Sequence, residues 1–157
     1  MAPKLQARPT TYKGVLMRSR LEAGFAQWLD QWSIEWEYEP ACFADETGQY
    51  LPDFRLDNVR CAWEETRFPV YVEVKPKPFD LVEFAQLARR MQIVHSTDPS
   101  ALLVLVTPGH TPTLIPCRGV SGLTPRAAWT TMPDDTLGLA LLIPDDLHPW
   151  VGEWWQA

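Results

Sequence analysis

The sequence predicts a single domain of the α/β class, formed by one chain of 157 residues. Two observations favour this class. Apolar residues recur with the period of a helix in two segments and with the period of a strand in several others. The predicted elements follow one another as helix, three strands, helix and strand, which is an alternation typical of mixed folds. Apolar residues make up 46% of the chain and charged residues 22%, a composition that excludes a disordered tail.

Residues 19–32 carry the clearest helical pattern. Their apolar side chains fall on one stripe at intervals of three and four residues: Leu21, Phe25, Trp28, Leu29 and Trp32. Ser19 is expected to cap the helix, and Glu22 stands three positions later, as in a capping box. The pattern therefore predicts an amphipathic helix that buries one face.

Three extended segments follow this helix. Residues 34–39 alternate apolar and acidic side chains, which is typical of a half-buried strand, and Pro40 ends the pattern. After a predicted loop, residues 50–56 form the second predicted strand, with Pro52 near its start. Residues 70–74 form the third, and the polar segment before them is expected to be irregular.

The pattern of residues 79–94 predicts a second helix. Its apolar face carries Leu81, Phe84, Ala85, Ala88 and Met91. Residues 101–107 are almost continuously apolar, as in a strand that is buried on both faces. Beyond them, residues 113–116 and 137–143 predict short strands between loops rich in Pro, Thr and Asp. We expect residues 108–157 to form an extension packed on the same domain.

The charge of the chain is unevenly distributed. The 14 Lys and Arg residues against 20 Asp and Glu residues give a net charge of −6, which by itself argues against nucleic-acid binding. However, the first 20 residues contain five basic side chains and no acid. We interpret residues 1–17 as a basic arm that docks through Tyr12, Val15 and Leu16, followed by a core over residues 18–107.

The cysteines and the apolar segments indicate the cellular compartment in which the protein is expected. Cys42, Cys61 and Cys117 are far apart and form no CxxC pair, so neither a disulfide framework nor a zinc ribbon is indicated. The longest apolar runs are far shorter than the roughly 20 residues that a membrane-spanning helix needs. The N-terminus lacks the apolar region of a secretory signal. We therefore expect a cytoplasmic protein with free thiols and no membrane association.

Four residues carry the predicted chemistry: Glu22 in the first helix, Asp53 after Pro52, and Glu73 and Lys75 at the end of the third strand. Alternation along a strand places Glu73 and Lys75 on one face, with their valine neighbours on the other. If the second and third strands pair, Asp53 lies next to Glu73. Carboxylates on adjacent strands suit a hard divalent cation that activates water, and a lysine adds positive charge beside a phosphate.

Four strings of the sequence resemble the PD-(D/E)XK nuclease superfamily: RSRLEAGFAQWLD, WEYEP, YLPDF and VYVEVKP. The similarity covers about residues 12–107 and is greatest to the compact nuclease domains of transposon-end-cleaving subunits and of phage endonucleases. It implies a restriction-endonuclease-like fold, a mixed central sheet flanked by helices. It also implies an active site of Glu22, Asp53, Glu73 and Lys75, in which Asp53 and Glu73 bind Mg²⁺ or Mn²⁺ with the assistance of Glu22.

The function implied by this resemblance is a metal-dependent DNA endonuclease of a phage, a mobile element or a defence system. Its products would carry 5′-phosphate and 3′-hydroxyl ends, and a second copy or a targeting protein would help to cut both strands. The basic side chains proposed for contact with the nucleic-acid backbone are Lys13, Arg18, Arg20, Lys77, Arg89 and Arg90.

Two other functions stay open from the sequence. The chain could be a non-catalytic nucleic-acid-binding or assembly protein on the same fold, or a nuclease whose substrate is RNA. The site residues also have structural alternatives: Glu22 as a helix cap, Asp53 as a turn residue, and Glu73 with Lys75 as an exposed ion pair. We interpret Glu39 as a solvated residue at a strand end, with support of a metal ligand as the alternative.

Overall fold

The computed structural model describes residues 7–57, 59–61, 69–77, 80–109, 112–115, 126–131 and 135–142. The strands are β1 (Thr10–Tyr12), β2 (Val15–Met17), β3 (Trp36–Tyr38), β4 (Phe43–Asp45), β5 (Gly48–Tyr50), β6 (Phe54–Leu56), β7 (Arg60–Cys61), β8 (Val70–Val74), β9 (Leu102–Val106), β10 (Thr113–Ile115), β11 (Arg126–Thr131) and β12 (Leu137–Leu142). The helices are α1 (Arg20–Gln31) and α2 (Leu81–Thr97). In this part of the chain, neither helix has the length and apolar character needed to cross a membrane.

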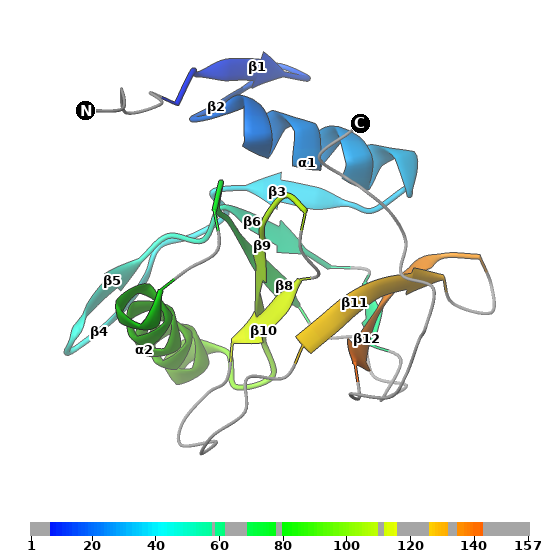
Figure 1. Ribbon diagram of the computed structural model, residues 1–157. Coiled ribbons are helices and arrows are strands. Elements are labelled where there is room, and N and C mark those ends of the chain that lie inside the picture. The colour runs from blue at the N-terminus through cyan, green and yellow to red at the C-terminus, as the bar shows by residue number, and fades with distance from the viewer. Residues whose placement is uncertain are drawn as a thin grey trace.

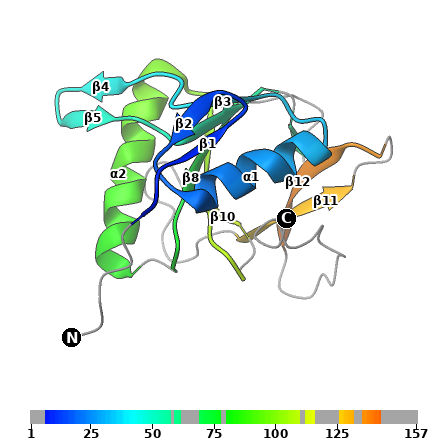
Figure 2. The same cartoon turned by 90° about the horizontal axis from the view of Figure 1, so that it is seen from above.

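The central element is a mixed sheet with strand order β3-β6-β8-β9-β10-β11-β12-β7. β8 and β9 run parallel and are joined through α2, whereas β6 pairs with β8 in the antiparallel sense. Figure 1 shows α1 above the sheet and α2 at its lower left, and Figure 2 shows the two helices from above. The predicted α/β class and the flanking of a mixed sheet by helices are confirmed.

Alternation along β8 divides the core between the two helices. Val70, Val72 and Val74 belong to the buried cluster that includes the apolar face of α1. Tyr71 points the other way and packs with Leu87 and other residues of α2. Because all five side chains of β8 are buried, this strand is covered on both faces.

The order of strands requires the sheet to curl. Only three residues separate β6 from β7, so their ends lie within about 14 Å. A flat sheet would hold these strands roughly 29 Å apart, because five strands intervene. Val59 and Leu139 of β12 accordingly join the same buried cluster as Phe25 of α1. The segments after residue 107 therefore continue the sheet that packs against α1.

α1 has the N-terminal cap that the sequence predicts. Glu22 and Ser19 form a complete capping box, with the Ser19 hydroxyl accepting from the Glu22 amide and the Glu22 carboxylate accepting from the Ser19 amide. At the other end, the Ile34 amide donates to the Leu29 carbonyl, and Ser33 adopts a φ of 56°. This turn starts the chain into β3.

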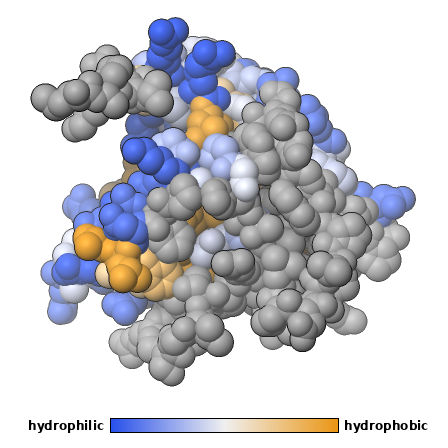
Figure 3. All heavy atoms as spheres, viewed as in Figure 1, coloured by the Kyte–Doolittle hydropathy of each residue, from blue (hydrophilic) through white to orange (hydrophobic). Residues whose placement is uncertain are grey.

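α2 buries only part of the face that was predicted, since Met91 is buried and Phe84 and Ala88 are partly buried against the core. Leu87, Met91 and Val94 are buried, whereas Leu81 is 86% exposed. Figure 3 shows hydrophobic side chains on the surface at the lower left, where α2 lies in Figure 1. The prediction that placed Leu81 and Ala85 on the buried face was wrong, because apolar residues surround the first turn and only packing against the sheet selects among them.

The described part of the basic N-terminal segment contains two strands, which were not predicted from the sequence. β1 and β2 form an antiparallel hairpin whose turn, Lys13-Gly14, has positive φ at both residues. Tyr12 and Val15 pack against the core as expected, whereas Leu16 is exposed. The hairpin was missed because each of its strands has only three residues.

Three other expectations need correction. The segment expected to be a loop forms the hairpin of β4 and β5. The predicted strand over residues 50–56 is interrupted, so that Asp53 lies at a bend immediately before β6. β11 was not predicted, although β8, β9, β10 and β12 lie where the sequence placed them. β4 and β5, with three residues each, carry too few residues for a periodic signal.

Candidate functional site

The pairing of β6 with β8 brings Asp53 and Glu73 together. The paired register of the two strands ends with Phe54 opposite Val72, and Asp53 immediately precedes this pair. The Asp53 amide donates to the Val72 carbonyl at 3.1 Å, and the Val74 amide donates to Asp53 Oδ2 at 2.8 Å, so the Asp53 carboxylate lies beside Glu73. The predicted pairing of the two strands, and the adjacency of the two acids that it implies, are confirmed.

Glu73 and Lys75 share one face of the chain, as the alternation of β8 predicts. The Lys75 Nζ lies 3.5 Å from the Glu73 Oε1, and the Arg90 Nη1 approaches the same oxygen at 3.5 Å from α2. Glu73 is 7% exposed, so this contact is not the solvated ion pair that was the structural alternative. The adjacent valines face the α1 cluster, as expected.

Glu22 reaches the site from the first turn of α1. Its Oε2 accepts hydrogen bonds from the Ser19 amide and from the Tyr38 hydroxyl, both at 3.0 Å. The backbone N–H of Arg18 donates to the same Tyr38 oxygen. Glu22 therefore caps the helix and, at the same time, holds a carboxylate against the start of the sheet.

The three buried acids use their two oxygens in the same way. One oxygen accepts from a neutral donor: Glu22 Oε2 from Tyr38, Asp53 Oδ2 from the Val74 amide at 2.8 Å, and Glu73 Oε2 from Tyr50 at 2.7 Å. In the described residues, the other oxygen meets only cationic side chains. Each carboxylate is thus oriented by the fold and offers one oxygen to a positive charge.

Arg18 contacts three of the acidic side chains at once. Its Nη2 lies 2.6 Å from Asp53 Oδ1 and 3.9 Å from Glu22 Oε1, and its Nε lies 3.0 Å from Glu39 Oε1. Glu39 is therefore ion-paired within the site and not simply solvated, which corrects our interpretation of this residue. We refer to Glu22, Glu39, Asp53 and Glu73 as the carboxylate cluster.

Burial and mutual repulsion change the proton affinity of Asp53. Its side chain is only 3% exposed. Burial, followed by the negative charge of Glu73, raises the pKa of Asp53 to about 7, although the Val74 amide and Arg18 oppose this shift. A carboxylate whose charge is disfavoured in this way is typical of a functional site.

The donor set fits a hard divalent cation. Glu22, Asp53 and Glu73 come from three elements and offer carboxylate oxygens, which are the ligands that Mg²⁺ and Mn²⁺ prefer. A cation would also reduce the repulsion that raises the pKa of Asp53. Within the described ranges, no three acidic, histidine or cysteine side chains are already arranged around a common metal position. Binding would therefore require side-chain movement.

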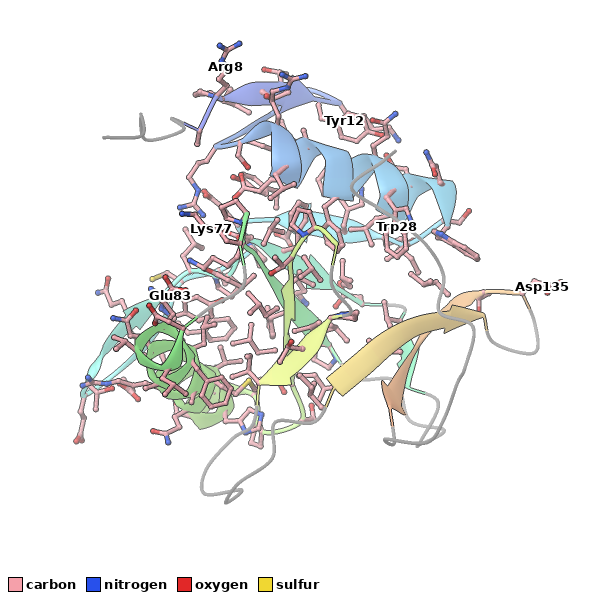
Figure 4. The ribbon with its side chains drawn as sticks, in the orientation of Figure 1. Arg8, Tyr12, Trp28, Lys77, Glu83 and Asp135 are labelled. Atoms are coloured by element: carbon pink, nitrogen blue, oxygen red, sulfur yellow. The ribbon has the colours of Figure 1, made fainter. Side chains whose placement is uncertain are left out.

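The basic residues that were predicted to contact the nucleic-acid backbone do not all lie beside the carboxylate cluster. Arg18 and Arg90 contact the carboxylate cluster, and Figure 4 shows Lys77 between α1 and α2 on the left side of the molecule. Lys13 pairs with Asp30 in the last turn of α1, at 2.9 Å. The remaining two are exposed, Arg20 at the start of α1 and Arg89 on α2.

Two tyrosines that orient the acids, Tyr38 and Tyr50, were not among the predicted site residues. Tyr38 was placed only as an apolar-face residue of a strand, and Tyr50 only as the first residue of another. Tyr50 is 5% exposed, and burial together with the charge of Glu73 raises its pKa well above the usual value. A buried tyrosine needs an acceptor for its hydroxyl, so tyrosines beside candidate acids were the available signal.

Replacing Tyr50 with phenylalanine is expected to destabilise the protein by roughly 1.5–3 kcal/mol, the range for a hydrogen bond to a charged group. The change keeps the ring but leaves Glu73 Oε2 without its hydroxyl donor. Urea unfolding measures the loss. Tyr71→Phe is the matched control, since Tyr71 is equally buried and makes no side-chain hydrogen bond within the described residues. Equal losses for the two variants would contradict this role of Tyr50.

Comparisons of the chain with known protein families, with curated proteins and with solved structures give no match.

Proposed function

We propose that the protein is a metal-dependent DNA endonuclease that hydrolyses phosphodiester bonds with Mg²⁺ or Mn²⁺. The observation that carries the proposal is the shared arrangement of Glu22, Asp53 and Glu73. Each is buried, each has one oxygen held by a neutral donor of the fold, and each offers its other oxygen to a cation. Stability alone does not favour gathering buried charges in this way, because their desolvation is costly.

The resemblance to the PD-(D/E)XK superfamily supports the same assignment. Its four motif positions are the residues that lie around the β6 and β8 ends and the first turn of α1. A mixed sheet with a helix on each face is compatible with the restriction-endonuclease-like fold that the resemblance implies. The proposal therefore has two supports, the sequence motifs and the burial and orientation of the same side chains.

The chain's own residues would divide the work as follows. Asp53 and Glu73 would hold the cation with their cation-facing oxygens, and Glu22 would assist from α1. When bound, the cation would polarise the scissile phosphate and lower the pKa of the attacking water. Lys75 would orient that water and stabilise the charge that develops on the phosphate. The water oxygen would form the new bond to phosphorus while the bond to the 3′ oxygen breaks.

The net charge of −6 is consistent with this function when its distribution is considered. A cation at the carboxylate cluster would reduce the repulsion of an approaching phosphate. Arg18 and Arg90 contact the cluster, Lys77 follows Lys75 by two residues, and all three would contact the DNA backbone. DNA binding is then expected to be weak without metal and to decrease as salt increases.

The test is an incubation of the protein with supercoiled, linear and branched DNA in Mg²⁺, in Mn²⁺ or in EDTA. We expect cleavage with either metal, none in EDTA, and a loss of roughly a hundredfold or more in Lys75→Ala and in Glu73→Gln. Glu37→Gln is the matched control, since this exposed glutamate lies on β3 opposite Arg55 and not opposite a residue of the carboxylate cluster. Cleavage that survives both site substitutions would overturn the assignment of the site.

Two other outcomes would favour other functions. A panel of single-stranded, duplex and branched RNA tests the RNA-directed nuclease. If the protein cleaves no DNA or RNA and binds no Mn²⁺, the acids have a structural role, and a binding or assembly protein becomes the better assignment.

A further inference from the structure

We propose that Arg18 is an exchangeable cation of the site: it occupies the carboxylate cluster when metal is absent, and a bound metal displaces it toward the phosphate of the nucleic acid. This inference rests on the proposed function and identifies how metal binding and substrate binding at that site are coupled.

Arg18 contacts the carboxylates as a bound cation would, because its guanidinium lies among several of them. Its guanidinium reaches Asp53, Glu39 and, more distantly, Glu22, at 2.6, 3.0 and 3.9 Å. These three acids come from different segments, before β6, after β3 and within α1. The contacted oxygen of Asp53 is the one that the fold leaves for a positive charge. A metal held by Asp53 and the guanidinium therefore need the same oxygen.

Arg18 is also the member of the site that is free to leave. Its side chain is 63% exposed, whereas those of Asp53 and Glu22 are 4% and 7% exposed. Its backbone is fixed by donation to the Tyr38 hydroxyl, immediately before the cap of α1. The guanidinium can therefore rotate away from the carboxylates into solvent while the Arg18 backbone stays beside the cluster. There it would meet the phosphate that the metal attracts, and its planar fork suits phosphate oxygens.

The charges of the cluster favour this exchange. When all four of its carboxylates are ionised, the three cationic side chains that contact them, Arg18, Lys75 and Arg90, leave one net negative charge. Replacing the single charge of Arg18 by a divalent cation balances the cluster. The released guanidinium then supplies a positive charge to the substrate, so metal binding would increase the affinity for DNA by more than the charge of the metal alone.

The first test is the affinity for Mn²⁺, measured by calorimetry or by electron paramagnetic resonance without nucleic acid. Arg18→Gln is expected to bind Mn²⁺ about tenfold more tightly than the wild type, because one charge-assisted hydrogen bond no longer competes. Arg18→Lys keeps the charge but lacks the fork, and it is expected to bind more tightly than the wild type as well. Arg8→Gln is the charge-matched control, since Arg8 points away from the sheet in Figure 4.

Several results would overturn the inference. Weaker Mn²⁺ binding by Arg18→Gln than by the wild type would show that the arginine helps to form the metal site. Wild-type affinity in Arg18→Lys would show that charge alone sets the affinity. If neither the wild type nor Arg18→Gln binds Mn²⁺, the proposed function fails together with this inference, whereas a wild type that binds Mn²⁺ as tightly as Arg18→Gln overturns this inference alone.

The second test measures DNA affinity by fluorescence anisotropy in the Lys75→Ala background, where cleavage is expected to be lost. Adding Arg18→Gln is expected to weaken binding about tenfold in Mn²⁺ and to leave it unchanged in EDTA, because the guanidinium contacts phosphate only after the metal displaces it. Equal losses in the two conditions would show that Arg18 contacts DNA independently of metal, and would overturn the exchange.

Discussion

Replacing Asp53 with asparagine is expected to reduce DNA cleavage by roughly a thousandfold or more while it stabilises the metal-free protein at pH 8. The loss of cleavage follows because an amide is a much weaker ligand for a hard cation than a carboxylate. The gain in stability follows because the wild-type carboxylate is buried beside Glu73 and loses its proton only near pH 7. Asparagine keeps an oxygen for the Val74 amide and carries no charge.

The direction of the pH dependence follows from the raised pKa of Asp53. In the unfolded chain this carboxyl loses its proton near pH 4. In the metal-free folded protein it keeps the proton until about pH 7. The folded state therefore binds more protons between these limits, and its stability falls as the pH rises through this range, by on the order of a few kcal/mol. Asp53→Asn should lack this part of the decrease.

Urea unfolding in EDTA at pH 5 and pH 8 measures this effect, and a gel assay with Mg²⁺ measures cleavage. Asp57→Asn is the matched control, because Asp57 follows the same strand but is exposed and paired with Arg55. We expect the control to cleave DNA like the wild type and to keep its pH dependence. Substantial cleavage by Asp53→Asn, or a pH dependence like that of the wild type, would contradict the role given to Asp53.

The second large effect concerns the core that holds α1 over the sheet. Phe25 is completely buried, stacks on Trp28 and meets the edge of Phe54, with ring centroids 5.3 Å apart. Phe25→Ala is expected to lower the free energy of unfolding by about 3–5 kcal/mol, since it removes a buried ring and leaves a cavity. The total free energy of unfolding of a domain of this size is roughly 5–15 kcal/mol, so the variant should be close to unfolding.

Urea unfolding at pH 7 tests this prediction. Gln27→Ala is the control on the same helix, and because Gln27 is exposed, its unfolding free energy should stay within about 0.5 kcal/mol of the wild type. A loss below about 1 kcal/mol for Phe25→Ala would show that α1 does not depend on this contact. The result also concerns the site, because α1 carries Glu22 and begins immediately after Arg18 and Ser19.

The elements with a long and regular pattern were predictable from the sequence. The stripe of Phe25 and its neighbours, with Ser19 and Glu22 at its start, contains both the helix and its capping box. β8 was predicted with its observed bounds, and the alternation of its residues separated Glu73 from Val72 and Val74. These properties depend on neighbours within a few residues, so the local sequence contains them.

Other features depend on packing between distant segments. The buried face of α2 was mispredicted in part, since Leu81 and Leu87 are equally apolar and only contact with β9 and β10 distinguishes them. The short hairpins have too few residues to show a period. The curl of the sheet follows from the pairing of β7 with β12, which no local pattern indicates.

For the candidate site, the sequence by itself determined which acids and which lysine are proposed to form it, and that Glu73 and Lys75 share a face. Only the tertiary structure decided that Asp53 lies beside Glu73, that Tyr38 and Tyr50 orient the carboxylates, and that Arg18 lies among them. The physical reason is that side-chain periodicity is local. Burial, hydrogen-bond partners and the raised pKa of Asp53 arise instead from segments that meet only in the folded chain.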